Sequence, residues 1–154
     1  NYNSRLSKLR FPLVKEFNNV LPLYSHIAKL KGIDIIVEIN SESLVYANAD
    51  TFAIVIRNLL DNALKYCKSK GKISIESHQN RNGVSLTFKN EMDYALSKGA
   101  FDAVKYLNSS SKNMDETRSM GLRLIKRYAK INNIRIEASI ENQSFLVILF
   151  FDKA

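Results

Sequence analysis

NLLDNALKY, at residues 58–66, is the most informative stretch of this 154-residue chain. Because an α-helix turns by about 100° per residue, Asn58, Asn62 and Lys65 fall within an arc of roughly 60° on one side of a helix. Apolar residues in and before the stretch recur at the spacing of a buried helical face: Phe52, Val55, Ile56, Leu59, Leu60 and Ala63. The pattern predicts an amphipathic helix whose polar stripe carries two amides and a lysine, with Tyr66 where the two faces meet.

The chemistry of this stripe suits a metal-chelated polyphosphate. Amide oxygens are hard ligands that Mg²⁺ accepts, and a lysine ammonium group is a point charge for phosphate. A solvated surface stripe is the simpler alternative. However, asparagine is a poor helix former, because its side chain competes for backbone hydrogen bonds. Two asparagines on one helical face therefore favour a binding role.

The nine residues resemble the N box of sensor histidine kinase catalytic domains, which belong to the Bergerat-fold (GHKL) ATPases. The pattern Asn-x-x-x-Asn-Ala-x-Lys-Tyr is matched without a gap, and the resemblance extends over about residues 11–151. It implies a protein histidine kinase of two-component signalling, which transfers the γ-phosphoryl group of Mg-ATP to a histidine. It also implies the site residues. Asn62, helped by Asn58, would bind Mg²⁺, and ATP would be bound by Asn58, Asn62, Lys65, Tyr66, Asn90, Gly121 and Leu122.

Within that resemblance, Lys65 would contact phosphate, Tyr66 would pack near the ribose or base, and Asn90 would read adenine. The two glycine-rich boxes of the family are degenerate here. Residues 90–93 read NEMD where the family has Asp-x-Gly-x-Gly, so Asn90 stands for the aspartate, with Asp93 as the alternative in another register. An amide oxygen can still accept a hydrogen bond from an amino group.

The later box reads SMGLRL at residues 119–124, and it keeps Gly121 alone. A glycine at a helix N-terminus lets the backbone approach phosphate, where free N–H groups and the helix dipole favour an anion. Arg118 or Arg123 could add charge. Hydrolytic relatives carry a glutamate that activates water at the position of Asn58, and an asparagine cannot act as a base there.

No phosphoacceptor histidine is expected in this chain, so it contains no catalytic residue of its own. The two histidines, His26 and His78, lack the His-Glu-x-x-x-Pro pattern. The acceptor is then expected in a dimerisation domain upstream in the same polypeptide, with a response regulator as the further partner. Since dimerisation resides in that hairpin, this fragment is expected to be monomeric.

Composition indicates one domain over residues 1–154, with 45% hydrophobic residues available for a core. The longest apolar run, Phe145–Phe151, is too short to span a bilayer, so the fragment is not expected to contact a membrane. The chain starts at Asn1 and shows no signal peptide, which favours a C-terminal piece of a longer protein. The single cysteine, Cys67, fits a reducing compartment. A cytoplasmic location, at the cytoplasmic end of a membrane-bound sensor, is the expectation.

The formal charge of +8 invites nucleic acid or anionic lipid as a partner. A basic helical stripe comprises Arg123, Lys126, Arg127 and Lys130, but no aromatic residues alternate with it as in a single-strand binding platform. Nucleic acid is therefore not expected as a partner.

The remaining pattern predicts an α/β (α+β) two-layer sandwich, in which about three helices pack on a mixed, mostly antiparallel sheet of about five strands. The expected helices cover residues 12–31, with a kink or break at Pro22, the helix ending at Tyr66 and capped by Asp50 or Thr51, and residues 120–132. The expected strands are 6–10, 33–40, 44–48, 72–78, 84–89, 134–140 and 145–151, with turns at 79–83 and 141–143.

Residues of about 90–120 resist assignment, apart from a short helix at 101–107. In the resembled family this interval is the ATP lid, so a mobile lid loop is expected, and a flexible surface loop is the alternative. Three hypotheses remain open. They are an active histidine kinase domain, a degenerate nucleotide-poor pseudokinase or scaffold of the same fold, and a basic binding module without a nucleotide site.

Overall fold

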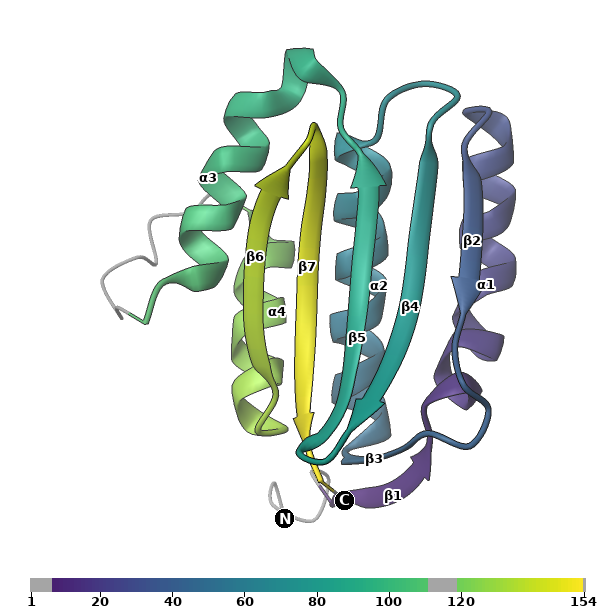
Figure 1. The fold of residues 1–154 in the computed structure, drawn as a ribbon, viewed down its shortest axis with the longest axis vertical. Helices are drawn as coiled ribbons and strands as arrows, with labels where there is room; N and C mark the ends of the chain where they lie inside the picture. Colours follow the sequence, from purple (N-terminus) through teal and green to yellow (C-terminus); the bar gives the residue numbers. More distant parts are fainter. Residues whose placement is uncertain (1–6, 111–118, 154) are drawn as a thin grey trace.

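The computed structural model describes residues 7–110 and 119–153, which form a sandwich of one main sheet and one layer of helices (Figure 1). None of the helices in this described part is long and apolar enough to cross a membrane. In chain order the elements are β1 (Leu9–Pro12), α1 (Leu13–Leu30), β2 (Asp34–Glu38), β3 (Leu44–Ala47), α2 (Ala49–Tyr66), β4 (Lys72–Asn80), β5 (Gly83–Glu91), the 3₁₀ turn η2 (Tyr94–Leu96), α3 (Ser97–Asn108), α4 (Met120–Ile131), β6 (Arg135–Glu141) and β7 (Ser144–Asp152).

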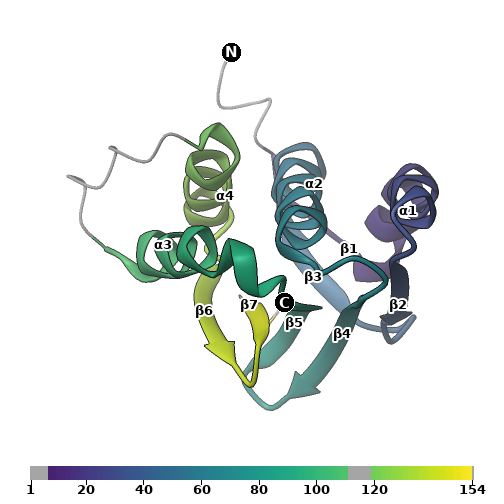
Figure 2. The same ribbon diagram turned by 90° about the horizontal axis from the view of Figure 1, so that it is seen from above.

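The main sheet has five strands in the order β2-β4-β5-β7-β6. Strands β2 and β4 run parallel, and the other neighbours are antiparallel. The expected mixed, mostly antiparallel sheet is thus confirmed. The helices lie on one face of it, with α3 over β6 at one end and α1 over β2 at the other (Figure 2). Alternation along β5 sends Val84, Leu86, Phe88 and Asn90 into this helix layer.

Helix α2 lies at the centre of the helix layer. Its apolar stripe is buried along the whole length of the helix. It packs against α1 on one side and α4 on the other, and against β5 and β7 beneath. The fourth helix, α3, was expected only as a short piece at 101–107, but it runs from Ser97 to Asn108. Ala100, Ala103, Tyr106 and Leu107 give it a narrow buried face.

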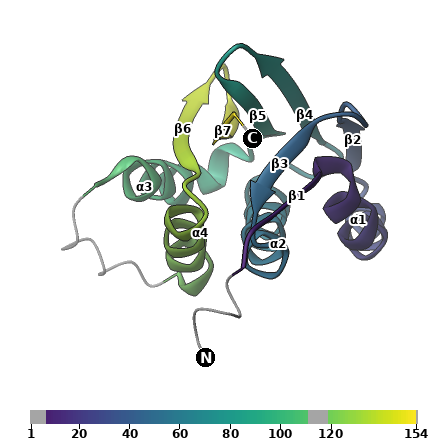
Figure 3. The same ribbon diagram turned by 90° about the horizontal axis from the view of Figure 1, so that it is seen from below.

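A second, two-stranded sheet pairs β1 with β3 beside the N-terminal end of α2 (Figure 3). The first strand starts at Leu9, and part of the expected strand 6–10 lies outside the described residues. The prediction of Asp50 or Thr51 as the cap of α2 is wrong. The helix is capped by Asn48, whose Oδ1 accepts the N–H of Thr51 at 2.9 Å, because Asn132 holds the backbone of Asn48 from the far side.

Pro22 lies inside α1 without dividing it, contrary to one of the two expectations. Because Pro22 has no N–H, the carbonyl of Asn18 loses its helical hydrogen-bond partner. Both residues are exposed, and this carbonyl therefore lies on the solvent side of the helix.

The hairpin turns are tighter than expected. Two residues join β4 to β5, and two residues with positive φ, Asn142 and Gln143, join β6 to β7. Such backbone angles match the right-handed twist of a hairpin.

Candidate functional site

The two asparagines and the lysine of the predicted polar stripe differ in how far they are buried along α2. Asn62 is 8% exposed, and its Nδ2 atom is buried without a hydrogen-bond partner. Asn58 is half-buried, and its Nδ2 donates to the carbonyl of Ile54 at 2.7 Å. This bond orients the Asn58 side chain so that Oδ1 is the end left for a ligand. Lys65 is exposed, with Nζ 5.3 Å from the centre of the Tyr66 ring.

Gly121 lies directly opposite Asn58, in the second position of α4. A Cβ atom added to Gly121 would lie 2.8 Å from Oδ1 of Asn58, closer than real Cβ contacts come. The absence of a side chain at Gly121 thus lets the first turn of α4 approach the Asn58 carboxamide. The structure thus brings together two predicted site residues that the sequence separates by more than sixty positions.

Ser119 is a contributor that the sequence analysis did not single out. It caps α4, and its hydroxyl oxygen accepts the N–H of Leu122 at 3.2 Å. A serine before an apolar helical run is the signal that could have identified it. Leu122 itself is buried, so its side chain belongs to the core and its N–H is already bonded. The first N–H groups of α4, at Met120 and Gly121, are the ones that an anion could meet.

Tyr66 is buried between α3 and the sheet. Its ring packs edge-on against Phe145, with centroids 5.3 Å apart, and its Cε1 lies 3.2 Å from where a Cβ of Gly99 would stand. Burial raises the pKa of the Tyr66 hydroxyl, and the charge of Asp102 raises it further. Gly99 was not foreseen as part of this packing, because it lies in the interval that resisted assignment.

Asn90 ends the buried row of β5 and is 2% exposed. Its backbone pairs with Ile73 of β4 and Phe145 of β7, and its Nδ2 is buried without a hydrogen-bond partner. The alternative residue, Asp93, uses its carboxylate to cap η2, where Oδ1 accepts the N–H of Ala95 at 3.0 Å. Asn90 thus keeps an unpaired amide donor within the helix layer, whereas the carboxylate of Asp93 is already bonded within its own turn.

The expected lid interval of about 90–120 contains the end of β5, η2 and the whole of α3. Its residues 111–118, which include Arg118, lie outside the described part of the chain. The expectation of a mobile lid loop therefore falls outside the described residues only at 111–118, whereas residues 94–108 of the interval form η2 and α3.

Within the described ranges, no group of three or more His, Cys, Asp or Glu side chains could hold a metal ion. A metal at this site would thus need ligands of another kind. The Oδ1 atom of Asn58, whose Nδ2 is bonded to Ile54, and the amide oxygen of Asn62 are ligands of the type that Mg²⁺ accepts, together with substrate phosphates and water.

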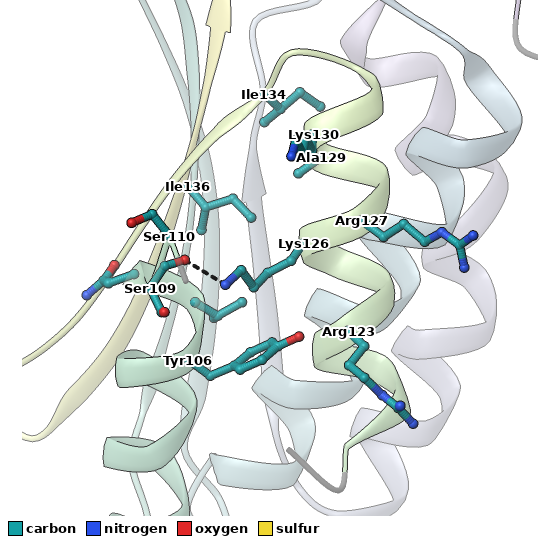
Figure 4. Close-up of a pocket in the computed structure, with 12 residues that line it drawn as sticks. Tyr106, Ser109, Ser110, Arg123, Lys126, Arg127, Ala129, Lys130, Ile134 and Ile136 are labelled. Atoms are coloured by element: carbon teal, nitrogen blue, oxygen red, sulfur yellow. Dashed lines mark hydrogen bonds between the residues drawn. The ribbon is translucent and has the colours of Figure 1, made fainter. Parts of the chain in front are cut away.

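A separate cavity of about 710 Å³ lies between α3, α4 and β6, away from these residues (Figure 4). Lys126 extends across it, donating to the carbonyl of Ser109 at 2.6 Å, with Nζ 4.5 Å from the Tyr106 ring centre. The guanidinium groups of Arg123 and Arg127 lie on the side of α4 away from Ser109 (Figure 4). All four residues of the basic stripe nevertheless line this cavity: Arg123, Lys126, Arg127 and Lys130. Apart from Arg123, which was suggested as a source of additional charge, the cavity contains none of the predicted site residues.

The sequence model of the GHKL domain family matches residues 48–152. The sensor protein kinase GraS of Staphylococcus aureus (strain JH1) is 29% identical over 126 residues, which are 80% of this chain and 34% of that protein. The chain thus spans about a third of the length of the curated relatives it matches.

Solved structures share the fold. The catalytic domain of histidine kinase ThkA, in a nucleotide-free form, superposes with a TM-score of 0.76 at 19% identity, over 96% of this chain and 97% of that one. The histidine kinase AdeS of Acinetobacter baumannii gives a TM-score of 0.73 at 16% identity, over 96% and 68% of the two chains. At this identity the likeness shows the sandwich fold.

Proposed function

Since this chain belongs to the GHKL domain family, we propose that it is the ATP-binding catalytic domain of a two-component sensor histidine kinase. Its activity would be the transfer of the γ-phosphoryl group of Mg-ATP to a histidine on another domain. The similarity to GraS, a sensor protein kinase, supports this choice among the members of the family. The fold shared with histidine kinase catalytic domains is consistent with it.

The observation that carries the proposal is the pair of unpaired amides. Among the described residues, three buried side-chain atoms lack a hydrogen-bond partner: Asn62 Nδ2, Asn90 Nδ2 and Arg123 Nε. Two of the three belong to residues that the sequence predicts for nucleotide binding. A buried donor without a partner costs about 1–3 kcal/mol, so such atoms are rare in native proteins and call for a ligand or another explanation.

Each residue would have a limited task. Asn62 and the free Oδ1 of Asn58 would hold Mg²⁺, which supplies charge neutralisation for the phosphate oxygens. Lys65, exposed at the end of α2, would contact phosphate. The N-terminal turn of α4, brought close by Gly121, would present backbone N–H groups to the anion, with Leu122 fixing that turn from the core. Asn90 would read the base, and Tyr66 would border the ribose or base.

Asn58 also bears on how ATP is used. A carboxamide cannot accept a proton at neutral pH, and the Nδ2 of Asn58 is already bonded to Ile54. Water next to it would therefore not be activated. We expect the site to hold ATP with little hydrolysis, so that transfer depends on positioning a separate histidine acceptor.

The partners belong to the same proposal. The acceptor histidine would lie in a dimerisation domain upstream of this chain, and a response regulator would receive the phosphoryl group. The cytoplasm is the proposed location, and this fragment would be a monomer. The alternative of a scaffold without nucleotide leaves the two unpaired amides without a function.

Calorimetric titration with Mg-ATP tests the proposal. The wild-type chain should bind in the presence of Mg²⁺ and lose binding when EDTA removes the metal. Asn62→Ala should weaken binding by about 10–100-fold, the effect of losing a bond to a charged group. Asn19→Ala, which changes an exposed asparagine of α1, is the matched control and should bind as the wild type does. A folded wild-type chain that binds no Mg-ATP, or equal binding by Asn62→Ala, would contradict the proposal.

A further inference from the structure

We infer that this site accepts purine nucleotides in general and does not select adenine, so that GTP binds it nearly as well as ATP. The inference rests on the proposed nucleotide-binding function and concerns the residue that meets the base. That residue is Asn90, an uncharged carboxamide with a donor at one end and an acceptor at the other.

The position of Asn90 fixes where the carboxamide lies but not which way it is turned. The backbone of Asn90 is held on both sides by the pairing of β5 with β4 and β7. The side chain follows Phe88 on the helix-facing side of the strand and is almost completely buried. Its Nδ2 has no hydrogen-bond partner, so no donated bond to the protein fixes one orientation of the amide. A rotation of about 180° about the last side-chain torsion exchanges donor and acceptor in place.

The donor and acceptor ends of the Asn90 carboxamide, which a rotation exchanges, can pair with either purine base. Adenine presents an amino donor at C6 and an acceptor at N1, whereas guanine presents an acceptor at O6 and a donor at N1. In one orientation the carboxamide accepts from the adenine amino group and donates to N1. In the other it donates to guanine O6 and accepts from N1–H. Each base can therefore satisfy both ends of the side chain, and neither leaves a buried donor unpaired.

A carboxylate at the same place would behave differently. It offers acceptors alone, so it can pair with the C6 amino group of adenine but meets the O6 atom of guanine with repulsion. Discrimination is strongest when the wrong ligand leaves buried polar groups unpaired or opposed. Asp93 does not supply this discrimination, because its carboxylate is bound to the N–H of Ala95 within its own turn.

The experiment compares Mg-ATP with Mg-GTP, each titrated calorimetrically into the same three proteins: the wild type, Asn90→Asp and Asn82→Asp. Asn82 is exposed in the turn at the other end of β5, so Asn82→Asp makes the same change of charge away from the helix layer. For the wild type and Asn82→Asp we expect the two dissociation constants to agree within about tenfold. For Asn90→Asp the preference for ATP should widen by at least tenfold, through weaker GTP binding.

The outcomes separate this inference from the function on which it rests. Wild-type protein that binds Mg-ATP but binds Mg-GTP more than a hundredfold more weakly would overturn the inference and leave the proposed function standing. An unchanged ATP-to-GTP ratio in folded Asn90→Asp would overturn it as well. Binding of neither nucleotide by folded wild-type protein would remove both. The wild-type ratio needs no variant, so the test holds even if Asn90→Asp does not fold.

Discussion

The Oδ1 atom of Asn58 faces Gly121 across the contact between α2 and α4, leaving no room for a side chain on the glycine. A methyl group there would lie 2.8 Å from the oxygen. The Asn58 amide cannot easily turn to relieve this contact, because its Nδ2 is bonded to Ile54. The packing of the two helices and the proposed phosphate-binding turn thus depend on the same pair of residues.

Gly121→Ala should therefore destabilise the protein, although alanine normally stabilises a helix relative to glycine by about 1 kcal/mol. Crowding against Asn58 should outweigh this gain, with a net loss of about 1–3 kcal/mol as for other overpacked contacts. In the Asn58→Ala background, which removes the oxygen, the same change should cost nothing or stabilise. Urea unfolding of the four proteins gives the coupling energy, and additive effects would show that the contact is not the cause.

Asn132 joins the ends of the same two helices and should be important for stability. It is 4% exposed, its Oδ1 accepts the N–H of Asn48, and its Nδ2 donates to Thr51 Oγ1 and to the carbonyl of Tyr128. Asn132→Ala leaves these groups buried without partners, so we expect a loss of about 1–3 kcal/mol or more. Thermal unfolding should show a lower Tm than for Lys130→Ala, a control at an exposed position of α4. Equal Tm values would contradict the role.

The long-range bonds of Asn132 also explain why the cap of α2 could not be predicted from the sequence. Asn48, Asp50 and Thr51 are all good capping residues, so local chemistry does not choose among them. The choice depends on Asn132, which lies eighty-four positions from Asn48 and holds its backbone N–H. The period of the apolar residues, in contrast, predicted the buried face of α2 well, because that face depends on helix geometry alone.

In the candidate site, too, the features that depend on one helix could be predicted from the sequence, and those that depend on packing between distant segments could not. The spacing of Asn58, Asn62 and Lys65 is a property of one helix and could be predicted. The burial of Tyr66 under α3 could not, because the polar residues of Ser97–Asn108 mask a narrow buried face of four residues, two of which are alanines. The closeness of Gly121 to Asn58 depends on how two distant helices pack. The resemblance suggested these residues as one site, but the contact itself is visible in three dimensions alone.

Cys67 should be an unreactive thiol in the folded protein. Burial raises its pKa to about 11, and the nearby charge of Glu91 contributes. Because the thiolate is the reactive form, alkylation by iodoacetamide at pH 8 should be at least a hundredfold slower than in urea-unfolded protein. The native rate should keep rising with pH up to about 11 as long as the fold persists. A native rate that levels off near pH 9 would contradict the raised pKa.

Gln143→Gly should stabilise the β6–β7 hairpin. Gln143 has a φ of 65° and follows Asn142 at 49°, angles typical of a turn that prefers Asn-Gly. Glycine adopts such angles without the penalty of a Cβ atom, so we expect a gain of about 0.5–1 kcal/mol in unfolding free energy. The bond from the N–H of Met92 to the carbonyl of Gln143 uses the backbone and would be kept. Lys89→Gly, at an interior position of β5, is the control and should lower stability in the same urea titration.

Glu16 should destabilise the folded protein at neutral pH. It is 8% exposed in the first turn of α1, and burial raises its pKa above the ordinary value of 4.5, with Lys15 partly opposing the shift. A carboxyl group whose pKa is higher in the folded than in the unfolded state makes the fold less stable as pH rises through these values. Glu16→Gln keeps the size and removes the charge, so the urea midpoint should rise at pH 7 and change little below pH 4. Glu38→Gln is the matched control, since it makes the same change at an exposed position of β2, and it should bring no gain at pH 7. An equal gain at both pH values, or a gain from both variants, would show that burial of the Glu16 charge is not the cause.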